Sequence, residues 1–299
     1  MRQPRPPGPR AEAGAPPAAT WVRIFSALAA FLAAMVVVWA GLPLLGPAYL
    51  LLAGTAVFEY AAMMRLRGIH VHRVPLLVAT VLTLPAALPA GVPLAFPWSD
   101  VVPWRQVVLG LFAFALIATE VARPRRESFV DVTYTLFGYV WIPWLFSYCL
   151  TLRYVPDGTL GLATFALPLL AVVASDVGGW VFGTAFGRRK LAPVLSPDKS
   201  VEGAVGGLGL AVVVVVVAGR LLEGWLGLHI DVHDEVTFAL LVASASQIGD
   251  LFESLVKRWA GVKDAGLFLP GQGGVLDRID SSLFALPVAY FFLALVVLR

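Results

Sequence analysis

The chain has 299 residues, of which 59% are hydrophobic and 14% are charged, and its mean hydropathy is +0.83. These values argue against a water-soluble fold. One cysteine and four histidines exclude an internal disulfide and the usual cysteine and histidine zinc site. The formal net charge of +3 would suggest nucleic-acid binding in a soluble protein. In a polytopic membrane protein it reflects basic cytoplasmic loops, so we expect no nucleic-acid partner.

The first 20 residues are rich in Pro, Ala and Gly and contain three arginines. Such a segment has too few large apolar groups to repay its ordering entropy, and we expect a disordered cytoplasmic tail over residues 1–20. Basic residues before the apolar run from Ile24 to Ala40 could also mark a cleaved signal peptide. That run is longer than a typical signal core of about 7 to 15 residues, which favours retention of the segment.

Nine apolar stretches follow the tail, each close to the roughly 20 residues that a helix needs to cross the hydrocarbon. They cover residues 22–40, 44–64, 74–96, 103–121, 129–151, 160–185, 204–225, 236–256 and 282–298. The third has the least regular pattern because four prolines interrupt it. We therefore expect an all-α polytopic membrane protein with nine transmembrane helices, in which residues 21–299 form a single transmembrane catalytic domain.

The distribution of lysine and arginine predicts how these helices are oriented. With a cytoplasmic N-terminus, all but four of the 22 lysines and arginines fall in cytoplasmic segments. The four exceptions are Arg105, Arg153, Arg220 and Arg299. Because basic residues favour the cytoplasmic side, we expect the N-terminus inside and the C-terminus outside. Two inside loops, 186–203 and 257–281, carry dense polar chemistry, and we expect them to form the active site.

The eighth predicted span ends in a polar stripe. Asp250, Glu253, Ser254 and Lys257 follow one another at helical spacing and therefore share one helix face. Carboxylates within a span cost roughly 2.5 to 3.5 kcal/mol each and normally face a polar cavity. An ion pair between Glu253 and Lys257 at the membrane interface is the alternative interpretation.

The next segment has a composition suited to phosphate. Residues 270–274 read PGQGG and are followed by Asp277, Arg278, Asp280 and Ser281 at the start of the ninth span. Glycines let backbone N–H groups approach an anion, and a helix N-terminus adds a positive dipole. A turn with an aspartate N-cap is the alternative.

Two aspartates are candidate metal ligands. Asp250 and Asp277 can meet across an antiparallel helix pair, and Mg²⁺ typically takes one or two carboxylates together with substrate phosphates. Cations suited to a phosphate or pyrophosphate group surround them in the sequence. These cations are Lys257, Arg258, Lys263 and Arg278. The same residues could instead serve the positive-inside bias or contact anionic lipid headgroups.

The loop over 186–203 provides a second group of polar residues. Asp176 precedes it, inside the sixth span at about the depth of Asp250. The loop itself carries polar side chains that could hold a nucleotide or a headgroup, namely Ser196, Lys199, Ser200 and Glu202. We interpret Gly206, Gly207 and Gly209 as helix-packing residues. Glu59 and Glu120 also lie within or near spans, but their spacing identifies no partner and we leave them outside the site.

Two blocks of sequence resemble a known family. The first comprises SLVKR (254–258), KDAG (263–266) and PGQGGVLDRID (270–280). The second comprises Ser175 and Asp176, FGR (186–188), LAP (191–193) and SPDKSVEG (196–203). Together they resemble the conserved blocks of the phosphatidate cytidylyltransferase family, also called CDP-diacylglycerol synthases. The resemblance covers about a fifth of the chain, and its ordered motifs are highly specific.

This resemblance implies a nucleotidyltransferase that converts CTP and phosphatidic acid into CDP-diacylglycerol and pyrophosphate. In the family, the positions of Asp250 and Asp277 belong to a two-metal centre with Mg²⁺ and a monovalent cation such as K⁺. The expected catalytic residues are Asp250, Lys257, Arg258, Asp277, Arg278 and Asp280. The expected substrate-binding residues are Asp176, Ser196, Lys199, Ser200, Glu202, Lys263, Asp264, Gly271, Gln272, Gly273 and Gly274. Membrane lipids are expected partners, a homodimer is a possible assembly, and the bacterial cytoplasmic membrane is the expected location.

Some positions depart from the family pattern. Gln272 stands where the family usually has His, and Asp198 where a basic residue is common. Two alternatives therefore stay open at this point. A polyprenol or phytol kinase would use CTP to phosphorylate an alcohol. A transporter would explain carboxylate side chains within the membrane without any catalytic turnover. Carboxylates at the cytoplasmic edge, rather than at the bilayer midplane, argue against the transporter.

Overall fold

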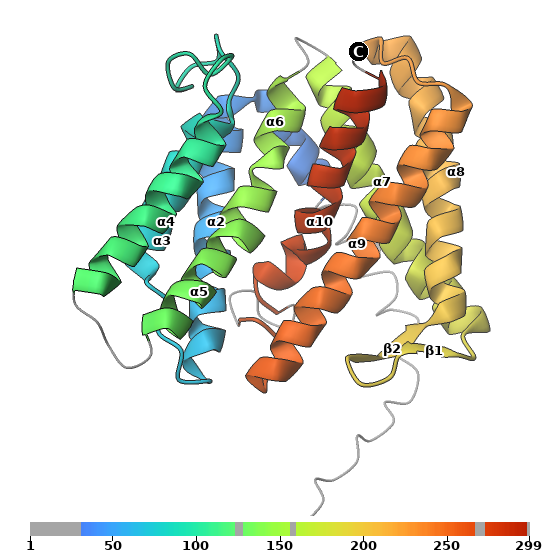
Figure 1. Ribbon diagram of the computed structural model, residues 1–299. Helices are drawn as coiled ribbons and strands as arrows, with labels where there is room; N and C mark the ends of the chain where they lie inside the picture. Colours follow the sequence, from blue (N-terminus) through green and yellow to red (C-terminus); the bar gives the residue numbers. More distant parts are fainter. Residues whose placement is uncertain (1–30, 123–127, 156–159, 267–272, 298–299) are drawn as a thin grey trace, which may run out of the picture.

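A computed structural model of the protein describes residues 31–122, 128–155, 160–266 and 273–297 (Figure 1). The predicted tail, residues 1–20, lies outside these ranges. The helices are Phe31–Ala40, α2 (Leu42–Arg65), α3 (Arg73–Ala87), α4 (Trp104–Ala122), α5 (Ser128–Tyr139), α6 (Tyr148–Tyr154), α7 (Leu160–Phe186), α8 (Val201–Leu226), α9 (Val232–Ala260) and α10 (Leu276–Phe292). Two π-helical segments, η1 (Val140–Trp144) and η2 (Leu293–Val297), continue α5 and α10.

The helical content confirms the prediction of an all-α membrane protein. Within the described residues, seven helices are long and apolar enough to cross a membrane. One of these runs from Ser128 to Tyr154 through α5, η1 and α6. Two shorter apolar helices are Phe31–Ala40 and α3. Each of the nine predicted spans overlaps one of these helices.

Several predicted boundaries were wrong, for identifiable reasons. The third span was expected to reach residue 96, but α3 ends at Ala87 because Leu88, which precedes a proline, is extended. The fifth contains a π-helical turn at Pro143, which cannot donate a backbone hydrogen bond. At the site, α9 runs on to Ala260 and α10 begins as early as Leu276. The polar residues there lowered the local hydropathy without ending the helices.

A small β-hairpin lies in the loop 186–203 and was not predicted. It pairs β1 (Lys190–Ala192) with β2 (Ser196–Ser200) in antiparallel register, with Lys190 opposite Ser200. Strand β2 leads directly into α8, where the Ser200 hydroxyl accepts a hydrogen bond from the Gly203 N–H at 3.1 Å. This N-cap fixes the hairpin to the first turn of α8.

The four helices that carry the site residues pack in two pairs, α7 with α8 and α9 with α10 (Figure 1). A Cβ atom on Gly207 would lie 2.5 Å from the Ser175 carbonyl oxygen, so this glycine permits the close approach of α7 and α8. Beyond the neighbouring backbone of its own helix, no atom of the described residues lies within 4 Å of such a Cβ on Gly209, and its predicted packing role is wrong. The apolar core extends between α2, α3, α7, α9 and α10, around large buried side chains such as Tyr49, Trp141 and Phe238.

Candidate active site

The C-terminal end of α9 and the N-terminal end of α10 meet through charged side chains. The Lys257 ammonium lies 2.6 Å from Asp277 Oδ1 and also pairs with Glu253, one helical turn before it. The Asp277 carboxylate further accepts hydrogen bonds from the Ala265 N–H at 3.0 Å and the Gly274 N–H at 2.6 Å. The predicted helix-face stripe therefore exists, and its Glu253–Lys257 pair is buried rather than exposed at the interface, with Glu253 0% exposed.

The hairpin brings a second lysine to α9. Lys199 on β2 forms an ion pair with Asp250, and both side chains are about one third exposed, 30% and 31%. Asp176 on α7 and Asp280 on α10 lie close enough to Asp250 for their charges to interact. Asp280 is buried, and its Oδ1 accepts the N–H of Ser281 at 2.6 Å. The structure thus brings both sequence blocks together at one end of the helix bundle (Figure 1).

The site contains more carboxylates than lysines paired with them. Its carboxylates are Asp176, Asp250, Glu253, Asp277 and Asp280, and the lysines paired with them are Lys199 and Lys257. Glu253 and Asp280 are buried. Charge on buried carboxylates is costly unless protons or bound cations compensate it.

The donor set fits a hard divalent cation that also binds the substrate. Within the described residues no three Asp, Glu, His or Cys side chains converge on one ion position. Asp250 pairs with Lys199 and Asp277 with Lys257, and the joint role of the two aspartates in holding an ion stays a prediction. The buried Glu253 Oε1 finds no hydrogen-bond donor in the described part of the chain. One or two carboxylates, with phosphate oxygens completing the shell, is the arrangement that Mg²⁺ uses.

Other predicted site residues have structural partners. Arg258 donates from Nε to the Leu195 carbonyl at 3.3 Å, which ties α9 to the hairpin turn. The Glu202 carboxylate accepts the N–H groups of Arg188 and Arg189 at 3.0 and 3.1 Å. It thereby holds the start of the hairpin against α8, while Ser200 caps that helix.

Several other predicted residues are exposed or take part in the hairpin. Lys263, Asp264 and Arg278 are exposed, and Ser196 pairs with Ala192 across the hairpin. Gly273 has a φ of 84°, a left-handed conformation that favours glycine. Gly271 and Gln272 lie outside the described residues. The substrate-binding roles of all these residues stay predictions.

Sequence reasoning left out one residue at the site. Glu59 on α2 is 8% exposed, and its carboxylate accepts hydrogen bonds from the N–H groups of Val275 and Leu276 at 2.9 and 2.8 Å. Its partners are more than 200 positions away in the chain, so no local spacing could reveal them. A carboxylate inside an apolar span was the only signal available in the sequence.

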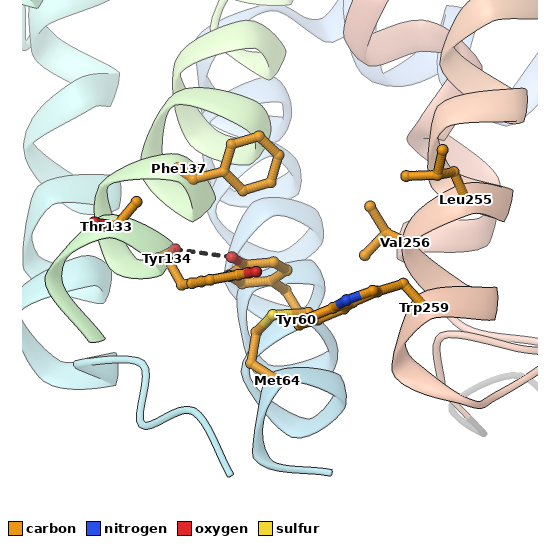
Figure 2. A pocket seen from close by; sticks show the side chains of 8 residues that line it. All are labelled: Tyr60, Met64, Thr133, Tyr134, Phe137, Leu255, Val256 and Trp259. Atoms are coloured by element: carbon orange, nitrogen blue, oxygen red, sulfur yellow. Dashed lines mark hydrogen bonds between the residues drawn. The ribbon is translucent and has the colours of Figure 1, made fainter. Parts of the chain in front are cut away.

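An apolar pocket of about 400 Å³ lies beside the site, between α2, α5 and α9 (Figure 2). Tyr134 and Trp259 stack across it at 5.5 Å between ring centroids, and the Tyr60 hydroxyl donates to the Tyr134 carbonyl at 2.8 Å. The lining residues are Tyr60, Met64, Thr133, Tyr134, Phe137, Leu255, Val256 and Trp259. Because this lining holds no lysine, arginine or carboxylate, the pocket does not suit a triphosphate, and the charged cluster is the better candidate for the chemistry.

Comparison with known proteins identifies the family of this chain. The model of the cytidylyltransferase family matches residues 21–296. A phosphatidate cytidylyltransferase of Staphylococcus epidermidis is 35% identical over 193 residues, which cover 63% of this chain and 71% of the relative. That of Staphylococcus aureus is 32% identical over 235 residues, 78% of this chain and 84% of the relative. That of Staphylococcus saprophyticus is 36% identical over 176 residues, 59% and 64% of the two chains.

Proposed function

The chain belongs to the cytidylyltransferase family, and we propose that it is a nucleotidyltransferase that converts CTP and phosphatidic acid into CDP-diacylglycerol and pyrophosphate. The observation that carries this proposal is the Lys199–Asp250 ion pair. It joins the hairpin block to the α9–α10 block, so the two sequence blocks that resemble the family form one site. The names of the relatives favour this reaction over the kinase and the transporter.

The reaction places modest demands on acid–base groups. A phosphate oxygen of phosphatidic acid attacks the α-phosphorus of CTP, and the bond from that phosphorus to the oxygen bridging to the β-phosphate breaks. The electron pair leaves with pyrophosphate. Since the lipid phosphate is already an anion, no strong base is needed. Catalysis then consists mainly of bringing several anions together in line and neutralising their charge.

The chain's own cations support this assignment. Lys257 lies between Glu253 and Asp277, and Lys199 pairs with Asp250, so each ammonium can be shared with a phosphate oxygen at the site. We assign Lys257 to the departing pyrophosphate and Lys199 to a phosphate of CTP. Arg258 positions the hairpin turn, to which its side chain is hydrogen-bonded.

Mg²⁺ is the proposed cofactor, with Asp250 and Asp277 holding it and a monovalent cation such as K⁺ beside it. The carboxylates of the site outnumber the lysines paired with them, which supports bound cations. When bound, Mg²⁺ would neutralise phosphate charge and orient the reacting groups. Asp280, Glu253 and Asp176 are further carboxylates of the same site.

We also propose nine membrane crossings, a cytoplasmic N-terminus and an external C-terminus, in the bacterial cytoplasmic membrane. The basic loop after α2, the hairpin and the α9–α10 junction lie at the same end of the bundle, which supports an active site facing the cytoplasm (Figure 1). Membrane lipids are the expected neighbours of exposed apolar residues on α8, such as Val205, Val213 and Val217. A homodimer stays a prediction. A cytoplasm-specific reporter active after Arg299 would contradict the proposed topology.

Product analysis tests the proposed reaction against the kinase alternative. Purified protein is given phosphatidic acid, a polyprenol, Mg²⁺ and CTP labelled at either the α- or the γ-phosphate. Cytidylyl transfer places only the α-label in the lipid and releases the γ-label as pyrophosphate. A kinase places the γ-label in a lipid alcohol and releases CDP, so label from γ in the lipid fraction would overturn the proposal.

A further inference from the structure

The first turn of α10 is held by a carboxylate from a different helix. Glu59 Oε1 accepts the Val275 N–H at 2.9 Å, and Oε2 accepts the Leu276 N–H at 2.8 Å. Each carboxylate oxygen therefore takes one backbone donor. The side chain comes from the C-terminal third of α2, and it is buried.

This contact replaces a local N-cap. The first backbone N–H groups of a helix have no partner within the helix and need one from outside. At the start of α10, Val275 occupies the cap position in a helical conformation, and no side chain there makes the usual capping bond. Glu59 supplies the missing acceptor, and its negative charge faces the positive end of the α10 dipole.

Glycine makes the approach of this carboxylate sterically feasible. A Cβ atom on Gly274 would lie 2.6 Å from Glu59 Oε1, closer than real contacts allow. The N–H of Gly274 is donated at 2.6 Å to Asp277 Oδ2. Three successive N–H groups, those of residues 274 to 276, are thus bound by two carboxylates. The position of Asp277 is coupled to the position of Glu59 through this single turn of backbone.

We propose that Glu59 is a positioning residue for cytidylyl transfer, which sets the first turn of α10 so that the Asp277 carboxylate faces Lys257 and the reacting phosphates. This inference rests on the proposed function, since it assigns Glu59 to the same site. Glu59 contacts no reacting group itself. It acts through backbone donors. The missing side chain at Gly274 leaves the space that the Glu59 carboxylate occupies.

The test compares Glu59→Gln with Glu120→Gln. Glu120 is a matched control because it is equally buried, at 8% exposure, and is bonded to Ser128 and His72 away from the site. A glutamine at position 59 keeps one acceptor and turns an N–H₂ group toward the other donor. We expect kcat to fall by roughly 10- to 100-fold for E59Q, as when a catalytic group is misplaced. For E120Q we expect kcat to change by less than about twofold, because its contacts lie away from the site.

A local readout separates positioning from general destabilisation. Backbone amide hydrogen exchange at Val275 and Leu276 should accelerate in E59Q, while the thermal unfolding midpoint of the folded protein changes no more than in E120Q. Gly274→Ala should accelerate the Leu276 amide and lower kcat in the same way, and adding it to E59Q should cause little further loss. Unchanged kcat per folded E59Q molecule, unchanged exchange, or an equal loss in E120Q would overturn the proposal.

These outcomes are distinct from failure of the proposed function. If the wild-type protein transferred no CMP, the reaction assignment would fail for both the wild type and the variants. Amide exchange at the start of α10 would still report whether Glu59 holds that turn. If the wild type is active and E59Q is equally active with faster exchange, then the contact is structural only, and the positioning role is wrong.

Discussion

The Lys257 ammonium lies 2.6 Å from the Asp277 carboxylate, across the junction of α9 and α10. The pair connects two helices whose polar ends were recognisable in the sequence. Glu253, one turn earlier on α9, forms a second ion pair with Lys257. A buried lysine between two carboxylates is held in place more firmly than an exposed one. In the proposed reaction this preorganised cation meets the departing pyrophosphate.

Replacing Asp277 with asparagine should lower kcat by at least about 100-fold, because the variant loses charge that both holds Lys257 and is proposed to bind Mg²⁺. Steady-state assays in detergent measure the effect. Asp231→Asn is the control, since that side chain is 83% exposed at the opposite end of α9 and should leave the rate unchanged. Near-normal turnover in D277N would remove Asp277 from the catalytic site.

Replacing Lys199 with alanine should reduce kcat/KM for CTP by about 10-fold or more, the effect of losing one charge-assisted bond of ~1.5 kcal/mol. Lys190→Ala is a matched control on the other strand of the hairpin, where the side chain is exposed. Titration of CTP at saturating phosphatidic acid gives the comparison. Equal effects of the two substitutions would indicate a general role of hairpin charge instead of a specific contact at Asp250.

The helix periodicity made much of this site predictable. Asp250, Glu253 and Lys257 share a face wherever residues 250–257 are helical, and the structure confirms that face. The meeting of α9 with α10 follows from the short connection between them. That Asp250 and Asp277 hold one ion together stays a prediction, since the structure shows each carboxylate paired with a different lysine.

Long-range contacts account for what the sequence did not reveal. Lys199 reaches Asp250 only because the loop after α7 folds into a hairpin, and three- to five-residue strands give little periodic signal. Glu59 has no partner near it in the chain. The early end of α3 at Ala87 and the helical continuation of α9 to Ala260 both show that the end of an apolar run does not fix the end of a helix.

Packing between α9 and α10 should be sensitive to a single methyl group. A Cβ on Gly249 would lie 2.7 Å from the Asp280 carbonyl oxygen, so Gly249→Ala must push the helices apart. We expect a loss of about 1 to 3 kcal/mol in the free energy of unfolding, seen as a lower thermal midpoint in detergent. Gly209→Ala on α8, where the added atom meets nothing within 4 Å, should be neutral or stabilising by up to about 1 kcal/mol. A stable G249A variant would contradict the packing of this junction.

Removal of divalent cations should abolish activity while leaving the helices folded. Chelation by EDTA should lower the rate by at least about 100-fold, because phosphate charge would then be uncompensated. Added Mg²⁺ should restore the rate, and far-UV circular dichroism should stay constant throughout. Asp250→Asn should raise the Mg²⁺ concentration needed for half-maximal rate. Full activity in EDTA would mean that Lys199 and Lys257 supply the positive charge alone.

The most direct test of the account follows both products of one reaction. Purified protein in detergent receives phosphatidic acid, Mg²⁺ and CTP labelled at the α-phosphate, and lipid-bound label and pyrophosphate are measured over time. We predict that CMP enters the lipid and pyrophosphate appears at equal rates, and that both require phosphatidic acid. Folded protein that forms no labelled lipid, or that releases CDP instead of pyrophosphate, would contradict cytidylyl transfer.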